Sequence, residues 1–267
     1  MEFNFENKVI IITGSSSGIG AETAKMFAHY KAKLCLVGRN ESRLQNVAQH
    51  CELISGNVPL CLLLDLIQPG SCEEVITKTI EKFKRIDVLV NCAGKLKLGT
   101  LDQSDIDVFD EMMAINLRVP YYLTQLALPH LIKSKGNIVN IGSSYLERYK
   151  PGFLPFSVSK NALEKFTRHA AMELVPEGVR VNIINPGVTR TNLIRYLNIA
   201  ESDVDYVYNN LIAELGLKKI LEPKEVAKLV LLVASNLMPN MAGSSLKMDG
   251  AVIGIRIINI HKQYFRK

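Results

Sequence analysis

The sequence predicts a single-domain α/β protein with a Rossmann fold, a doubly wound parallel sheet of about seven strands. Three observations lead to this prediction. Apolar runs of strand length recur along the whole chain, segments long enough for helices separate them, and a glycine-rich segment follows the first run. Apolar runs without alternation are typical of strands buried on both faces, as in a parallel sheet covered by helices.

The predicted strands follow one another at helix-length intervals, which gives a repeating β-α-β order. No internal repeat and no Pro/Gly-rich linker divides the 267 residues, so one domain accounts for residues 1–267. The runs are Val9 to Ile12, Leu34 to Val37, Leu60 to Leu64, Val88 to Val90, Ile138 to Ile141, Val179 to Ile184 and a short one near Leu246.

Two segments differ from this pattern. Residues 192–217 form a polar, tyrosine-containing stretch between the sixth strand and the next helix, which we interpret as a substrate lid. Residues 251–267 form a C-terminal tail with an apolar run, which we interpret as a contact to a second subunit or to the lid.

Charge and composition exclude several classes of function. The net charge is +6, but the lysines and arginines form no dense run and no aromatic-interleaved basic patch, so we expect no nucleic-acid partner. A positive field would favour an anionic cofactor. The chain lacks any run of about 18 apolar residues, and its first residues do not resemble a signal peptide. We therefore expect a cytoplasmic protein with no membrane partner.

The cysteines and histidines predict neither disulfides nor a metal site. The five cysteines are odd in number and lack CxxC spacing, so we expect reduced thiols. The five histidines are not spaced, among themselves or relative to the cysteines, as the ligands of a metal ion are, so we expect no metal site.

The strongest local signal is the segment Thr13-Gly14-Ser15-Ser16-Ser17-Gly18-Ile19-Gly20, between the first strand and a helix that begins near Ala21. Glycines allow a tight turn and close approach to a pyrophosphate, and the free N–H groups at a helix start favour its negative charge. The position of the motif between a strand and a helix supports a dinucleotide site.

This TGxxxGIG spacing resembles that of the short-chain dehydrogenase/reductase family, and further segments agree in order over residues 7–251. Asn91-Cys92-Ala93-Gly94 resembles the family's NNAG segment, with Cys92 in place of the second Asn. Asn182, Pro186, Gly187 and Thr191 resemble its N…PG…T segment, and Lys247-Met248-Asp249-Gly250 its closing strand.

The resemblance implies a set of cofactor contacts. Asp65 would contact the adenine ring, the segment at Pro186 would hold the nicotinamide carboxamide, and a lysine would bind the nicotinamide ribose. The implied cofactor-binding residues are Gly14, Ser16, Ser17, Gly18, Ile19, Gly20, Arg39, Asp65, Asn91, Ala93, Gly94, Lys160, Pro186, Gly187, Val188 and Thr191.

The end of the second strand favours NADP(H) over NAD(H). An acidic side chain at this place would bind the ribose 2′-hydroxyl and repel a 2′-phosphate. The chain has Gly38-Arg39-Asn40 instead, and an arginine can pair with the phosphate. The alternative is that Arg39 is a solvated loop residue.

The family's catalytic set is Asn, Ser, Tyr and Lys, with Tyr and Lys in a YxxxK motif. Asn116, Ser143 and Lys160 match three of the positions by their flanking segments, but Phe156 stands at the tyrosine position. The tyrosine hydroxyl protonates the alkoxide that forms when a ketone is reduced, and phenylalanine has no proton to give. We therefore expect strongly impaired carbonyl reduction.

Three explanations of Phe156 stay open from the sequence. The chain is a natural pseudoenzyme, or Tyr145 or Tyr149 acts as a displaced acid, or the tyrosine of an active enzyme was replaced by design. For Tyr145 and Tyr149, the competing interpretation is an aromatic pocket wall or a surface loop. Asn116, Ser143 and Lys160 also have purely structural interpretations, as a helix cap, a strand-end turn and a helix-surface charge.

Two functions therefore compete. The first is an NADP(H)-dependent oxidoreductase of small or mid-sized carbonyl or alcohol substrates. The second is a catalytically silent protein that binds NADP(H) or a partner. The family resemblance also implies a homodimer or homotetramer, paired through the fourth and fifth helices.

Overall fold

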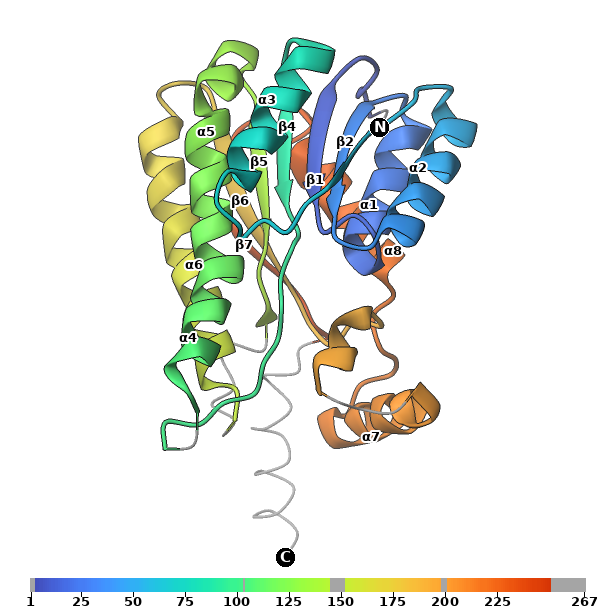
Figure 1. The fold of residues 1–267 in the computed structure, drawn as a ribbon, viewed down its shortest axis with the longest axis vertical. Coiled ribbons are helices and arrows are strands. Elements are labelled where there is room, and N and C mark those ends of the chain that lie inside the picture. The colour runs from blue at the N-terminus through green and yellow to red at the C-terminus, as the bar shows by residue number, and fades with distance from the viewer. Residues whose placement is uncertain (1–2, 103, 145–151, 198–200, 251–267) are drawn as a thin grey trace, which may run out of the picture.

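The computed structural model describes residues 3–102, 104–144, 152–197 and 201–250 (Figure 1). It confirms the predicted fold class: the strands form a seven-stranded sheet in the order β3-β2-β1-β4-β5-β6-β7, and every neighbouring pair is parallel. The strands are β1 (Val9–Thr13), β2 (Lys33–Gly38), β3 (Leu60–Leu63), β4 (Val88–Asn91), β5 (Asn137–Ile141), β6 (Arg180–Pro186) and β7 (Ser245–Met248).

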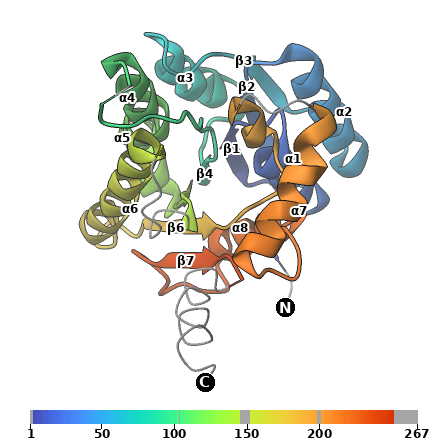
Figure 2. The same ribbon diagram turned by 90° about the horizontal axis from the view of Figure 1, so that it is seen from below.

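Helices connect the strands on both faces of the sheet. They are α1 (Gly18–His29), α2 (Glu41–Ser55), α3 (Ser71–Phe83), α4 (Ile106–Met113), α5 (Val119–Ser134), α6 (Leu154–Leu174), α7 (Val204–Leu215) and α8 (Pro223–Ala234), with a π-helical turn η1 (Ala114–Arg118) and 3-10 turns η3 (Asn192–Leu197) and η4 (Glu201–Asp203). Figures 1 and 2 place α1, α2 and α8 on one side of the sheet and α3 to α6 on the other.

Two hydrophobic cores explain why these residues form strands. Neighbouring side chains of a strand point to opposite faces, so Ile10 and Ile12 pack under α1 and α8, while Ile11 packs under α3 and α5. All three are fully buried. A sheet covered on both faces needs apolar residues at every position, which is the continuous pattern that the sequence carries.

The strand order reverses between β1 and β4. The crossovers from β1 lead outward to β2 and β3, and those from β4 lead the other way to β5, β6 and β7. The loops that leave the carboxyl ends of β1 and β4 therefore diverge and leave a crevice, where open α/β sheets bind their ligands.

Helix α7 lies beyond the carboxyl ends of the strands, below the sheet in Figure 1. A small third core, with Ile194, Tyr208 and Ile220 buried at its centre, holds α7 against the segment that follows β6. The stretch 192–217 is thus more helical than its polar composition predicts. The tail 251–267 lies outside the described residues. Within the described part of the chain, no helix is both long enough and apolar enough to cross a lipid bilayer.

Candidate active site

The glycine-rich turn after β1 is shaped for close backbone approach. Gly14 and Gly18 have φ of +67° and +57°, in the left-handed region that favours glycine. A Cβ atom on Gly14 would lie 2.9 Å from the Cα of Ala93, and one on Gly20 would lie 2.4 Å from the carbonyl oxygen of Gly14. These positions exclude side chains, so the first turn of α1 presents its backbone to the crevice.

The ends of β1 and β4 are joined by one hydroxyl. Thr13 Oγ1 accepts hydrogen bonds from the backbone N–H groups of Cys92 and Ala93, both at 3.0 Å. Asn91 stands just before them, and its amide Nδ2 donates to Asn140 Oδ1 on β5 at 2.9 Å. Asn91 therefore supports the sheet beneath the crevice.

The crevice holds a cavity of about 740 Å³. The volume and the glycine-rich turn after β1 fit a dinucleotide, because most of the residues implied to contact the cofactor line this one cavity. Asn91 and Asn116 do not line it. Those that do are Gly14, Ser16, Ser17, Gly18, Ile19, Gly20, Arg39, Asp65, Ala93, Gly94, Lys160, Pro186, Gly187, Val188 and Thr191, together with Ser143 and Phe156.

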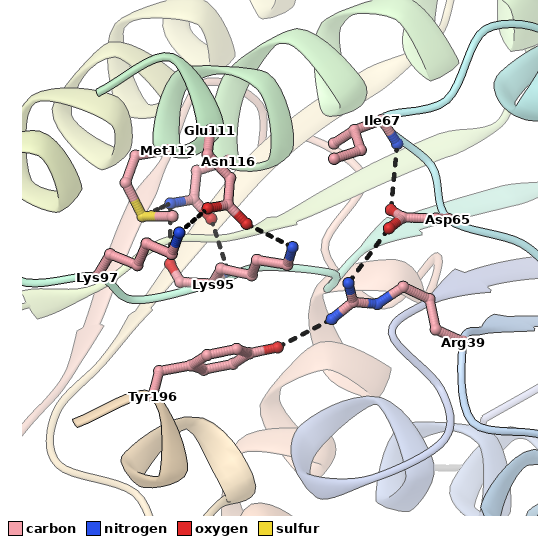
Figure 3. Close-up of polar contacts among 9 residues, drawn as sticks. All are labelled: Arg39, Asp65, Ile67, Lys95, Lys97, Glu111, Met112, Asn116 and Tyr196. Carbon is pink, nitrogen blue, oxygen red and sulfur yellow. Dashed lines mark hydrogen bonds and ion pairs between the residues drawn. The ribbon is translucent and has the colours of Figure 1, made fainter. Parts of the chain in front are cut away.

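Arg39 follows the end of β2 and lines the cavity. Figure 3 shows its side chain between Asp65 and Tyr196. Its guanidinium donates hydrogen bonds to Asp65 Oδ2 at 3.3 Å and to the Tyr196 hydroxyl at 3.0 Å. Arg43, in the first turn of α2, lines the same cavity. Two arginines and one carboxylate are therefore available to a nucleotide here.

Lys160 is held in the wall of the cavity by a backbone contact. Its Nζ donates a 2.7 Å hydrogen bond to the carbonyl oxygen of Ile141, at the end of β5. The residue is only 6% exposed, and burial lowers the pKa of its ammonium from 10.5 to about 8. A Cβ atom on Gly94 would lie 3.4 Å from Nζ, so the glycine leaves the ammonium accessible from the cavity.

Phe156 lies one helical turn before Lys160 on α6 and lines the same cavity. Its side chain is buried, with the residue 5% exposed. The structure thus brings Ser143, Phe156 and Lys160 to one space, as the motif spacing predicts. Tyr145 and Tyr149, the two displaced-acid candidates, lie outside the described residues.

Ser143 is positioned by a residue that the sequence did not single out. Its backbone N–H donates to Asn185 Oδ1 at 3.0 Å, and Asn185 is fully buried at the end of β6. A Cβ atom on Gly142 would lie 1.9 Å from the same oxygen. Only glycine at position 142 leaves room for the amide that holds Ser143.

Asn116 fixes the loop after β4 rather than facing the cavity (Figure 3). Its side chain accepts from the backbone N–H of Lys95 at 3.1 Å and donates to the carbonyl oxygen of Lys95 at 3.0 Å. It also donates to Ser159 Oγ at 3.1 Å. Asn116 lies in the π-helical turn η1, which interrupts the helical path between α4 and α5.

The side chain of Lys95 is neutralised by a carboxylate of α4. Its Nζ donates to Glu111 Oε1 at 2.6 Å, and Lys97 pairs with the other oxygen (Figure 3). Burial opposes the charge on Glu111, but the hydrogen bonds from the two lysines prevail and lower its pKa.

Tyr208 connects helix α7 to Thr191, another residue that lines the cavity. The Tyr208 hydroxyl accepts from the Thr191 N–H at 3.2 Å and lies 3.3 Å from the Thr191 carbonyl oxygen. The Arg190 guanidinium lies over the tyrosine ring, 4.8 Å from its centroid, and pairs with Asp205 on α7.

Asn185, Lys95 and Tyr208 were not predicted as site residues. Asn185 could have been found from the sequence, because an asparagine inside the apolar run before Pro186 is expected to be buried and hydrogen-bonded. The partners of Lys95 and Tyr208 lie 16 and 17 residues away in the chain, and no local pattern indicates such pairs.

The arrangement combines a dinucleotide-sized cleft with an ammonium, a serine and an aromatic wall. Such a site can hold a cofactor and orient a polar double bond beside it. Among the residues that the structure describes, no three His, Cys, Asp or Glu side chains gather as ligands for a metal ion.

Comparisons with known proteins agree with this description. The family model described as "short chain dehydrogenase" matches residues 8–202. An uncharacterized oxidoreductase of Thermotoga maritima is 31% identical over 248 residues, which cover 92% of this chain and 98% of that protein.

Two solved structures share the fold over nearly the whole chain. A Caenorhabditis elegans short-chain dehydrogenase/reductase of unknown function, crystallised with cofactor, is 32% identical, with a TM-score of 0.88 and coverage of 93% and 96% of the two chains. L-Sorbose reductase from Gluconobacter frateurii, complexed with NADPH and L-sorbose, is 25% identical, with a TM-score of 0.88 and coverage of 95% and 99%.

Proposed function

This chain belongs to the short-chain dehydrogenase/reductase family, and we propose that it is an NADP(H)-dependent oxidoreductase of carbonyl or alcohol substrates whose carbonyl chemistry is impaired at Phe156. The observation that carries the proposal is the shared cavity of the glycine turn, Lys160 and Phe156. A bound nicotinamide would exchange a hydride with the substrate carbon.

Each residue would contribute in a distinct way. The turn from Gly14 to Gly20 would hold the pyrophosphate by backbone N–H groups, and Lys160 would donate to the nicotinamide ribose. Ser143 would orient the substrate oxygen. Phe156 cannot donate a proton to that oxygen, and general acid–base catalysis contributes about 10²–10⁴ in rate.

The preference for NADP(H) rests on charge. Arg39 and Arg43 line the cavity, and the position directly after β2 is Arg39 rather than an aspartate or glutamate. A 2′-phosphate would compete with Asp65 for the Arg39 guanidinium and carries more charge. The relative with sorbose reductase activity was crystallised with NADPH, which supports the same preference.

A catalytically silent NADP(H)-binding or partner-binding protein is the second candidate, and Phe156 itself favours it. Titration calorimetry with NADPH and NADH, followed by NADPH consumption with a panel of ketones and aldehydes, separates the two functions. Binding with slow consumption supports the impaired oxidoreductase. Binding without any consumption supports the silent protein, and failure to bind either dinucleotide contradicts both proposals.

We further propose that the segment 192–217 closes over the substrate, that the protein is cytoplasmic and that it assembles as a homodimer or homotetramer. Helix α7 supports the first proposal, because Val207 and Leu211 line the cavity from that segment. The exposed apolar side chains of Ile106 and Tyr121 on α4 and α5 support assembly. Light scattering of the purified chain tests the assembly.

A further inference from the structure

The wall of the cavity beside Lys160 is aromatic where a proton donor is expected. Phe156 and Phe153 both line this space from the start of α6. A phenylalanine ring presents an electron-rich face that attracts a cation, but it can neither donate a proton nor accept one.

The lysine and tyrosine side chains of the cavity are held in place by other groups. Among the described residues, the lysines and tyrosines that line the cavity each have a hydrogen-bond partner. The partners are Ile141 O for Lys160, Glu111 for Lys95, Arg39 for the Tyr196 hydroxyl, and the backbone of Thr189 and Thr191 for the Tyr208 hydroxyl. Burial also raises the pKa of the Cys92 thiol to about 12.

Because Phe156 lines the cavity at the position of the family's proton donor, the site suits an acceptor that needs no proton. We propose that the substrate of this site is a preformed iminium ion, a cationic C=N⁺ group on an apolar framework, rather than a neutral ketone. This inference rests on the proposed NADP(H)-dependent activity and deepens it by naming the substrate class.

The step balances without a proton. The iminium carbon gains a C–H bond and two electrons from a reduced nicotinamide, which is oxidised to its pyridinium form. The C=N π pair becomes the lone pair of a neutral amine, so the positive charge passes from substrate to cofactor. A ketone given the same two electrons becomes an alkoxide, which needs an acid that Phe156 does not provide.

The surroundings of the aromatic wall suit such a cation. Leu193, Val207 and Leu211 also line the cavity and would cover an apolar framework. Burial disfavours the charged form of Lys160, which lessens its repulsion of a second cation near pH 8.

The test uses a pair of compounds with the same bicyclic skeleton: N-methyl-3,4-dihydroisoquinolinium, whose charge is permanent, and the ketone 1-tetralone. Binding is measured by calorimetry with the site occupied by 1,4,5,6-tetrahydro-NADPH, a reduced analogue that donates no hydride. We expect the cation to bind at least tenfold more tightly than the ketone. Equal affinities, or tighter binding of the ketone, would overturn the proposal.

Two variants show whether the aromatic wall causes the difference. Phe156→Leu keeps an apolar side chain but removes the ring, and it should lower the affinity for the cation while leaving that for 1-tetralone unchanged. Phe109→Leu, on the exposed surface of α4, is the matched control and should change neither affinity. An unchanged preference for the cation in Phe156→Leu would contradict the role of the ring.

Turnover gives an independent result. After subtraction of the reaction without protein, the parent should consume NADPH with the iminium faster than with 1-tetralone, and Phe156→Tyr should raise the ketone rate at least 100-fold more than the iminium rate. Equal gains for both compounds would overturn the proposal. Failure of tetrahydro-NADPH and NADPH to bind would instead contradict the proposed function, so the two failures are distinguishable.

Discussion

Lys160 Nζ donates a 2.7 Å hydrogen bond to the carbonyl oxygen of Ile141, and this contact holds the ammonium in the cavity without any group on Phe156. The lysine therefore lines the cavity although the residue one turn before it lacks a hydroxyl. The cofactor contact proposed for Lys160 and the proton transfer proposed to be missing at position 156 can therefore be tested separately.

Replacing Lys160 with methionine should weaken NADPH binding, because the ammonium would donate to the nicotinamide ribose while methionine keeps only the apolar stem. We expect a loss of about 1–3 kcal/mol, which calorimetry can measure. Binding of 2′,5′-ADP, which lacks the nicotinamide half, should not change. An unaltered NADPH affinity would mean that Lys160 only fills the cavity wall.

The same substitution should change how stability depends on pH. The pKa of Lys160 falls from 10.5 to about 8 on folding, so the unfolded chain binds more protons between these values and the parent gains stability as pH rises across that window. At about 1.4 kcal/mol per pKa unit, the gain amounts to a few kcal/mol relative to Lys160→Met.

Urea unfolding of both proteins at pH 7, 8, 9 and 10 measures this difference. The buried thiols of Cys35 and Cys51 act in the opposite direction, because burial raises the pKa of each to about 12, but both are present in the two proteins and cancel in the comparison. Parallel stability curves for parent and variant would show that the ammonium is not buried as described.

Arg39→Ala should reduce the preference for NADPH over NADH. A charged hydrogen bond to the 2′-phosphate is worth about 1–3 kcal/mol, and NADH offers no such group. Lys78→Ala is the matched control, because Lys78 is also exposed and ion-paired, with Glu81 on α3. Equal affinities of the parent for the two dinucleotides would refute the assignment of Arg39.

Tyr208→Phe should weaken NADPH binding about three- to tenfold, since the Thr191 backbone would lose the hydroxyl that holds it. Thr191 would contact only the nicotinamide end, so the affinity for 2′,5′-ADP should stay constant. Tyr206→Phe, on the exposed side of α7, is the control. Equal losses for both ligands would indicate general loosening of α7 rather than a local effect on Thr191.

The sequence predicted the sheet and the residues that line the cavity at the glycine turn better than the contacts that hold the rest of the cavity in place. Ile10, Ile11 and Ile12 indicate a doubly covered strand by themselves, and Gly14 to Gly20 form a contiguous motif whose conformation depends on local backbone freedom. Local patterns of this kind can be interpreted without knowing which segments meet.

Contacts between distant segments were harder to predict. Gly142 has no room for a side chain because Asn185, on the neighbouring strand of the sheet, occupies the space where a Cβ atom would lie. The hydroxyl of Tyr208 reaches Thr191 only because α7 folds back under the sheet. A single sequence gives no sign of such pairs, because neither residue has a local pattern that depends on the other.

The central claim is that the cofactor site is intact and that the missing hydroxyl at position 156 limits carbonyl reduction. The most direct test compares NADPH consumption by the parent and by Phe156→Tyr over one panel of ketones and aldehydes, with calorimetry as a check that both bind NADPH equally. The account predicts a rise of about 100-fold or more in the variant, because the new phenol would lie one turn from Lys160. Efficient carbonyl reduction by the parent, with no gain in Phe156→Tyr, would contradict it.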